Sequence, residues 1–427
     1  MKPEKLFKYL NSATALVLFL ALSAFGSTDK ANGKKITFTT KSEKAKELVA
    51  QIVKGIESYQ GGQPMLPLAQ QAVEADPEFA FAHYLVGTMT PPPNNRVHTD
   101  KAIELAKKAS DAERLYIEAV MLTRAQSYAE ATKIFTDLEK QFPEERMVKM
   151  MLAQVYTNEG KLDKAQMALE KAIQIDGSTP RAYGFLGNIH LLKGDYSKAR
   201  ELYTTALSKP VKGVAPFGPY NGIAYTYIYE GKPEEALKSL NKYLEAYNQS
   251  GGPQGFPPVF IWNAIGRVLL ETGRAEESIK AYEKGYEDVK ASSTIDDLQK
   301  KIWYGRVIHG KGRALAKMGK HEEAWKEADS IKKMIEEGGE QGKQFWPSYH
   351  YIAGYLKLES KDYAKAIEHL KQSDLTDPFH KLLLARAYDQ SGDKENAHKL
   401  YQEIVDSNQI TIERALSFNE AKKKLKA

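Results

Sequence analysis

The apolar residues of this 427-residue chain recur at intervals of three and four, the spacing that places side chains on one face of an α-helix. In the middle of the chain this pattern itself repeats. Ala131, Ala165 and Ala199 lie 34 positions apart, and Gly160 and Gly194 repeat the same interval. A glycine at the turn can take the positive φ that ends a helix. The pattern therefore predicts pairs of antiparallel helices that are stacked along the chain.

The small residue of the second helix can be followed outwards from these three alanines. The series of these small positions predicts ten repeats over about residues 46–410, followed by a capping helix and tail at 411–427. The spacing is 34 only between about residues 112 and 210, and the longest insertions fall between 210 and 346. A specialised site is expected in that irregular part. The ten small positions are Met65, Ala102, Ala131, Ala165, Ala199, Ala236, Ser278, Ala324, Ala366 and Ala397.

The fifth repeat carries its side chains in an order that resembles the tetratricopeptide repeat (TPR). A bulky residue, a Leu-Gly pair and an aromatic ring come first, then a turn glycine, a small residue, an aromatic and another small residue. The resemblance implies an all-α fold, a right-handed α-α superhelix of about ten helix pairs. The residues that carry it are Tyr183, Leu186, Gly187, His190, Gly194, Ala199, Tyr203 and Ala206.

Composition and charge agree with a soluble, folded chain. The sequence is 42% hydrophobic and 27% charged, and its 61 cationic and 55 anionic residues are interspersed, as on solvated helix faces. A nucleic-acid partner is not expected, because binders of nucleic acid usually collect their basic residues on one stripe. The lysines within 422–426 are interpreted as a solvated terminus rather than as an anion-binding arm.

The N-terminus has the three parts of a secretory signal. Lys2, Lys5 and Lys8 precede the apolar run 13–22, and small residues follow, with cleavage predicted after Gly26. Residues 1–26 are therefore predicted as a signal peptide and 27–45 as a linker. The run is short for a membrane span, so a retained anchor is the weaker alternative and no membrane insertion is expected after cleavage. We expect the protein to be periplasmic or secreted.

No residue pattern indicates catalysis. The chain has no cysteine, so thiol chemistry, disulfides and a lipidated cysteine are excluded. His321 and Glu322 begin like a zinc-protease helix, but Trp325 stands where the second His is required. The six histidines after residue 300 are expected to be scattered rather than convergent. We therefore predict that the protein is not an enzyme and has no metal or cofactor.

A binding surface is what the resemblance implies instead, since the first helices of a TPR solenoid line its concave face. Large amphipathic Tyr and Arg side chains there favour a peptide partner. Alternatively, the tyrosines pack between repeats and the arginines are only solvated. Gly184 replaces the Lys of the carboxylate clamp that some TPR proteins have, so this clamp is not expected. The predicted contact residues are Asn188, Tyr225, Tyr229, Arg267, Arg313, Tyr355 and Arg386.

The sequence therefore predicts a non-enzymatic scaffold of the bacterial cell envelope that binds a protein or peptide through this concave face. The alternative is a glycan-binding component of an outer-membrane uptake system. That alternative requires exposed aromatic platforms, and burial of Trp262, Trp303, Trp325 and Trp346 would count against it.

Overall fold

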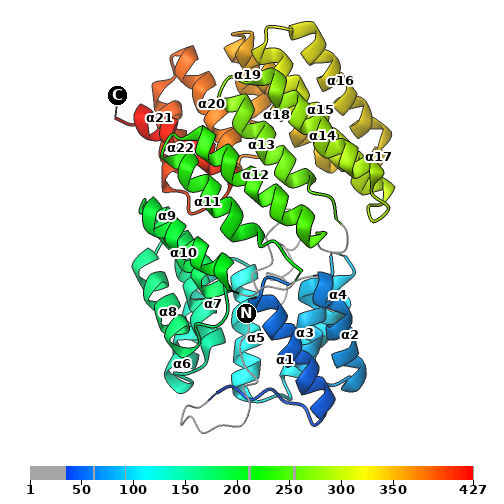
Figure 1. The fold of residues 1–427 in the computed structure, drawn as a ribbon, viewed down its shortest axis with the longest axis vertical. Helices are drawn as coiled ribbons and strands as arrows, with labels where there is room; N and C mark the ends of the chain where they lie inside the picture. The colour runs from blue at the N-terminus through cyan, green and yellow to red at the C-terminus, as the bar shows by residue number, and fades with distance from the viewer. Residues whose placement is uncertain (1–34, 61–62, 92, 210–212, 253–255, 427) are drawn as a thin grey trace. The chain divides into compact units, whose positions relative to one another are not determined.

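The computed structural model describes the chain except for residues 1–34, 61–62, 92, 210–212, 253–255 and 427 (Figure 1). Throughout the described residues the only regular secondary structure is helical. The chain divides into two compact units, Met1–Pro219 and Tyr220–Ala427, and the boundary falls inside helix α11. The predicted signal peptide lies outside the described residues.

Unit 1 contains five helix pairs in which each helix packs on the next one along the chain. A short 3-10 helix, η3 (Gln63–Met65), precedes α2. The helices are α1 (Glu43–Glu57), α2 (Leu66–Ala75), α3 (Ala80–Met89), α4 (Asn95–Ala106), α5 (Asp111–Arg124), α6 (Tyr128–Gln141), α7 (Arg146–Asn158), α8 (Leu162–Ile175), α9 (Arg181–Leu192) and α10 (Tyr196–Ser208).

Unit 2 continues the pairing and adds one further helix at its end. Two short helices, α17 (Gly339–Gly342) and η5 (Lys343–Phe345), lie in one of its connections. The helices are α11 (Phe217–Tyr229), α12 (Pro233–Ser250), α13 (Val259–Glu271), α14 (Ala275–Ala291), α15 (Asp297–Lys317), α16 (His321–Glu337), α18 (Trp346–Glu359), α19 (Tyr363–Leu370), α20 (Pro378–Ser391), α21 (Lys394–Asp406) and α22 (Ile412–Lys424). The predicted all-α architecture of stacked helix pairs is confirmed.

Small residues let the paired helices approach closely, as the pattern predicted. A methyl group on Gly187 of α9 would lie 2.7 Å from the ring of Tyr203 on α10, and one on Gly266 of α13 would lie 2.7 Å from Tyr282 on α14. Nine of the ten predicted small positions are on second helices and buried, with relative exposure of 2% or less. Large apolar side chains fill the space beside each glycine, which is why interior packing stays dense.

Met65 is the exception among the ten small positions. It lies in η3, half-buried, and the second helix of its pair begins at Leu66. Pro67 fixes this start, because proline favours the first turn of a helix, where its missing N–H is not needed. Ala69 is the fully buried small residue of this helix.

The segment before α1 packs into unit 1. Ile36 and Phe38 are buried, and the Phe38 ring stacks on Phe81 of α3 with centroids 4.0 Å apart. The backbone N–H of Ile36 donates to Glu145 at 3.2 Å, and that of Thr39 donates to Glu113 at 2.6 Å. Part of the stretch predicted as a linker is therefore a component of the core.

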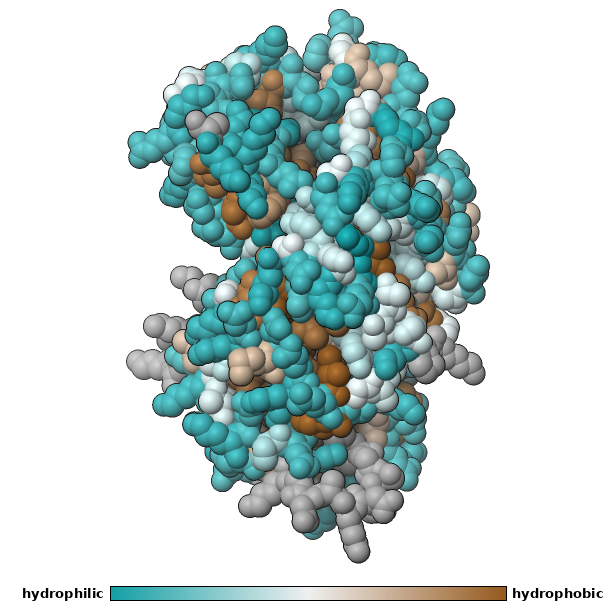
Figure 2. All heavy atoms as spheres, turned by 60° about the vertical axis from the view of Figure 1, so that its left-hand side comes forward, coloured by the Kyte–Doolittle hydropathy of each residue, from teal (hydrophilic) through white to brown (hydrophobic). Residues whose placement is uncertain are grey.

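The outer surface carries few large apolar residues. Figure 2 shows hydrophobic side chains as patches set among hydrophilic ones on the face it presents. Scattered exposed apolar residues are normal for a soluble domain. Within the part of the chain that the structure describes, no helix combines the length and the apolar character that a membrane span requires.

Candidate functional site

Six of the seven predicted contact residues lie in unit 2, on first helices of their pairs. Tyr225 and Tyr229 are on α11, Arg267 is on α13 and Arg386 is on α20. All four contact or face the last helix, α22. We call the surface formed by these four residues, together with Asp389 of α20, the α22 seat. Figure 1 labels the helices that carry these residues, α11, α13 and α20, and also α22.

The end of α22 nearest α11 is held by the two tyrosines. The backbone N–H of Ile412 hydrogen-bonds the Tyr225 hydroxyl, and Arg414 donates to the Tyr229 hydroxyl at 2.7 Å. The Phe418 ring meets the Tyr229 ring edge-to-face at 5.3 Å between centroids. Both tyrosines are about 5% exposed, so their rings are packed against the protein itself.

Arg267 forms an ion pair with Glu413 in the first turn of α22. Its guanidinium also lies over the Phe379 ring, 5.2 Å from the centroid. Burial disfavours the charged guanidinium, but the Glu413 carboxylate outweighs this, and the pKa of Arg267 lies above its ordinary value. A charge as buried as this one requires such a partner, because an unpaired charge in the interior is very costly.

Arg386 binds α22 about two turns closer to the C-terminus of that helix than Arg267 does. Its Nε and Nη2 atoms donate to the two carboxylate oxygens of Glu420 at 2.8 and 2.6 Å, a bidentate geometry. Lys424 extends the contact with an ion pair to Asp389 at 2.6 Å. Burial raises the pKa of Glu420, but the hydrogen bond from Arg386 outweighs it, so this pKa lies below its ordinary value.

Helix α22 forms where it does for local reasons. The Thr411 hydroxyl accepts the backbone N–H of Arg414 at 3.2 Å and caps the helix. Glu413 lies in the first turn and three lysines lie in the last, which suits the helix dipole at both ends. The sequence predicted this helix region as a cap, but it gave no sign that the helix would fill the predicted contact surface.

Arg313 and Tyr355 have a different role from the one predicted. Arg313 is 4% exposed and donates to the Tyr282 hydroxyl at 3.4 Å, and Tyr355 has no exposed surface. The Arg313 guanidinium lies 5.9 Å from the centre of the Tyr355 ring. Contact with a partner through these two residues stays a prediction, and in this structure both side chains pack inside unit 2.

Asn188, the seventh predicted contact residue, lies on α9 of unit 1. Its side-chain oxygen accepts a hydrogen bond from the Tyr203 hydroxyl at 2.7 Å. The side chain is half-buried and ties the two helices of its pair together.

Arg306 is a functional candidate that the sequence pattern missed. It lies on α15, is exposed, and interacts electrostatically with Glu413 and Arg267. The residue of α15 at the repeat position predicted to face the concave surface is Arg313 instead. Arg306 is two turns earlier on α15, a helix that extends from Asp297 to Lys317 and is longer than an ordinary first helix.

The histidines of unit 2 are less scattered than predicted. The Nδ1 atoms of His350 and His369 are 3.0 Å apart, and the Tyr351 ring contacts those of His309 and His380 at 4.3 and 3.7 Å between centroids. Neighbouring repeats bring equivalent helix faces together, an effect that spacing along the chain did not reveal. Among the described residues, no group of three or more His, Cys, Asp or Glu side chains is arranged to hold a metal ion.

The four tryptophans are all half-buried. The Trp262 indole donates to Asp288 at 3.0 Å, Arg306 covers the Trp303 ring, and Lys357 covers the Trp325 ring. None of the four forms an exposed platform of the kind that a sugar ring would stack on.

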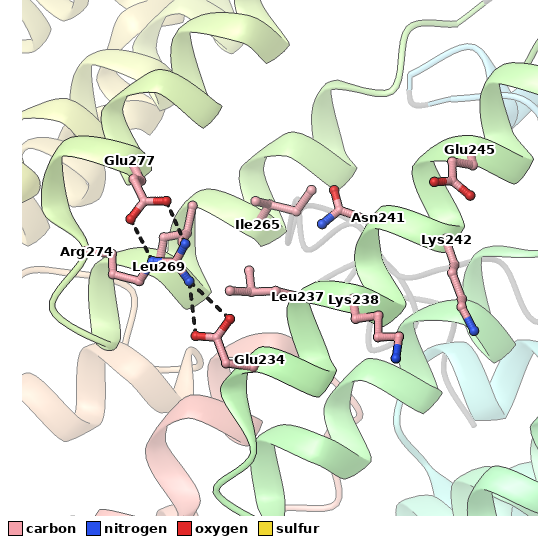
Figure 3. Close-up of a pocket in the computed structure, with 10 residues that line it drawn as sticks. All are labelled: Glu234, Leu237, Lys238, Asn241, Lys242, Glu245, Ile265, Leu269, Arg274 and Glu277. Atoms are coloured by element: carbon pink, nitrogen blue, oxygen red, sulfur yellow. Dashed lines mark hydrogen bonds and ion pairs between the residues drawn. The ribbon is translucent and has the colours of Figure 1, made fainter.

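A hollow of about 620 Å³ lies between α12, α13 and α14 (Figure 3). Arg274 bridges its rim by pairing with Glu234 at 3.1 Å and with Glu277 at 2.6 Å. These three charged side chains form two ion pairs on the surface, where each ion pair contributes little to stability. The hollow has no convergent acid, base and nucleophile that could carry out a reaction.

The paired helices, small–large contacts and turn glycines define a tetratricopeptide-type repeat scaffold. Residues 146–208 and 218–291 match the family model described as tetratricopeptide repeat. Scaffolds of this type are typical of protein–protein interaction and are generally not catalytic.

Human cilia- and flagella-associated protein 70 is 26% identical over 133 residues, which is 30% of this chain and 11% of that protein. The chain thus spans about a tenth of that relative. Two solved structures are also similar. A tetratricopeptide repeat protein from Parabacteroides merdae is 17% identical, with coverage of 66% of this chain and 97% of that one and a TM-score of 0.41. PilW, a type IV pilus biogenesis factor, is 15% identical, with coverage of 55% and 98% and a TM-score of 0.40.

Proposed function

We propose that the protein is a non-enzymatic scaffold of the bacterial cell envelope that binds a protein or peptide through the first helices of unit 2. One observation carries the proposal. The α22 seat already holds a helical peptide segment through an ion pair, a bidentate pair and tyrosine hydrogen bonds. A surface that can bind a helix of its own chain in this way has the chemistry to bind a helix of another.

The envelope location rests on the pattern of the N-terminal residues. Three lysines, an apolar run and small residues up to Gly26 support export with cleavage, and the absence of cysteine supports an unlipidated mature protein. Localisation of the tagged chain by cell fractionation tests this. Recovery in the cytoplasm with an intact N-terminus would refute it.

Arg306 offers the most direct test of binding, because its side chain is exposed and its charge interacts with those of Arg267 and Glu413. We expect Arg306→Glu to reduce the capture of an acidic partner from envelope extract about tenfold or more. Lys301→Glu makes the same charge change on the same helix at an exposed residue and should leave capture unchanged. Equal capture by the wild-type chain and both variants would refute a role for this surface.

Charge reversal at Arg267 and Arg313 is a less informative test of binding than the change at Arg306. Both side chains are largely buried, so either change would leave an unfavourable charge inside unit 2 and disturb folding as well as binding.

A further inference from the structure

The N-terminal part of helix α15 is not covered by the rest of unit 2. All of the buried residues of this helix lie at Val307 or beyond, so none of residues 297–306 is buried. Two large apolar side chains are exposed in this part, Leu298 at 60% and Ile302 at 37%. Single exposed apolar residues are normal on a soluble protein, but these two lie one turn apart on the same helix face.

The same face of α15 is a packing surface further along the helix, where α18 covers it. Positions 298, 302, 305, 309 and 312 follow one another at intervals of three and four, which places them on one face. His309 stacks on Tyr351 of α18 with ring centroids 4.3 Å apart, and a methyl group on Gly312 would lie 2.7 Å from Ile352 of α18. The part that α18 does not cover, which we call the α15 stripe, is Leu298, Ile302 and Gly305.

Gly305 of the α15 stripe is a glycine that no contact among the described residues requires. A methyl group on it would come no closer than 4.0 Å to any described atom outside its own stretch of helix, whereas one on Gly310 or Gly312 would approach a neighbour to 2.5 or 2.7 Å. Glycine inside a helix costs about 1 kcal/mol relative to alanine. Beside two exposed apolar side chains, it allows the backbone of a second helix to approach closely.

The two edges of the α15 stripe differ in charge. On one edge Lys301 lies one turn from Asp297, so this edge is close to neutral. On the other edge Arg306 forms no ion pair with a described carboxylate, and its guanidinium lies over the Trp303 ring, 4.7 Å from the centroid. A partner with carboxylates along the Arg306 edge gains an ion pair there, and complementary charge of this kind selects between partners.

We propose that the α15 stripe docks an amphipathic helix of a partner protein, whose apolar seam is bordered by carboxylates on one edge. The inference rests on the proposed function and names the chemistry of its partner. Leu298 and Ile302 pack against the apolar seam, Gly305 lets the helix come close, and Arg306 pairs with the carboxylates. The docked helix continues the layer that α18 forms on the same face of α15.

Two other occupants fit the α15 stripe less well. An anionic membrane would meet the carboxylates of Asp296 and Asp297 in the first turn of α15, and these offset the attraction of the nearby lysines. A second copy of the chain would offer the same stripe, which contains no carboxylate that could meet Arg306. Complementary charge therefore favours a partner helix.

Two fluorescent synthetic helical peptides test the proposal on the full-length protein. Both repeat Leu at intervals of three and four, and one has Glu along one edge of that seam where the other has Lys. We expect the Glu peptide to bind about tenfold more tightly than the Lys peptide in fluorescence anisotropy. In Leu298→Gln/Ile302→Gln its affinity should fall about tenfold. Val97→Gln/Met167→Gln removes two exposed apolar side chains of unit 1 and should bind as the wild type does.

Two further measurements establish where the peptide binds. Because Leu298 and Ile302 are exposed, the double variant should keep the melting temperature of the wild type. Bound Glu peptide should slow hydrogen exchange in residues 297–306 and leave unit 1 unchanged. Equal affinity of the Glu peptide for the wild type and Leu298→Gln/Ile302→Gln, or equal affinity of the two peptides for the wild type, overturns the proposal.

Vesicles and sedimentation test the other two occupants. Binding of the wild type to phosphatidylglycerol vesicles that Leu298→Gln/Ile302→Gln abolishes would assign the α15 stripe to a membrane surface and overturn docking of a helix. A wild-type dimer in sedimentation that the same double variant dissociates would assign the stripe to a second copy, with the same consequence.

The outcomes separate this inference from the proposed function. Capture of an envelope partner that depends on Arg306 but survives Leu298→Gln/Ile302→Gln would support the scaffold and refute docking on the α15 stripe. Binding of the Glu peptide to the stripe, without any Arg306-dependent partner in envelope extract, would support the docking surface and count against the envelope scaffold.

Discussion

At the scale of single residues, Tyr282 shows how the repeat sets packing. Its ring lies between two first helices, and a methyl group on Gly266 or on Gly310 would approach it to 2.7 or 2.5 Å. The side chain is 2% exposed and has glycine on both sides. It therefore has little room to move away from an added carbon.

We expect Gly266→Ala to destabilise unit 2 by about 1–3 kcal/mol through overpacking. Gly305→Ala is the matched control, because its nearest side-chain neighbour is 4.0 Å from the added methyl group. That change should be neutral or stabilise the helix by up to about 1 kcal/mol. Thermal unfolding followed by circular dichroism measures both, and equal melting temperatures would contradict the packing described here.

The small–large alternation was predictable from sequence because it is local. A residue at a fixed offset within each repeat meets the same kind of neighbour, so Ala131, Ala165 and Ala199 could be assigned as buried without any structure. The contact residues were less predictable. Tyr225 and Arg267 were correctly placed on first helices, but the segment that covers them lies about 150 or more residues further along the chain.

At the scale of elements, the segment before α1 is fixed by two buried carboxylates. Glu145 accepts the backbone N–H groups of Ile36 and Met147, each at 3.2 Å, and is 1% exposed. Burial raises the pKa of Glu145 to about 7. The folded state thus holds a proton at Glu145 more tightly than the unfolded chain, whose ordinary carboxyl pKa is near 4.5.

The direction of the pH effect follows from this. The stabilisation from Glu145 is fully present below about pH 4.5 and is lost as the pH rises through about 7, and it amounts to about 3 kcal/mol. Compared with Glu145→Gln, which does not titrate, the wild type should therefore gain stability between pH 7.5 and pH 5. Urea unfolding at both pH values measures the difference between the two proteins. Glu130→Gln, at an exposed carboxylate, should show no such pH dependence relative to the wild type.

An identical stability difference between wild type and Glu145→Gln at both pH values would contradict the raised pKa of Glu145.

The anchoring of the segment before α1 was not predictable from the sequence. Nothing in the composition of residues 35–41 distinguishes a linker from a packed segment, and the carboxylates that hold it lie about 70 to 110 residues away.

At the scale of the whole molecule, the repeat determines the fold of each unit but not what the protein binds. Many TPR chains share the helix pairs, whereas the α22 seat depends on particular side chains, Arg267, Arg386 and Tyr229, and on the two glutamates that meet the arginines. We therefore locate function in contacts that the motif does not specify. Tyr229 and Arg267 lie in the irregular part between residues 210 and 346 and Arg386 lies beyond it, so a specialised site within that part stays a prediction.

Hydrogen exchange of the full-length protein, with and without a captured partner, tests the central claim most directly. We expect a bound partner to protect amides on the first helices of unit 2, α11, α13, α15 and α20. Protection confined to second helices or to unit 1 would contradict binding through the first helices of unit 2.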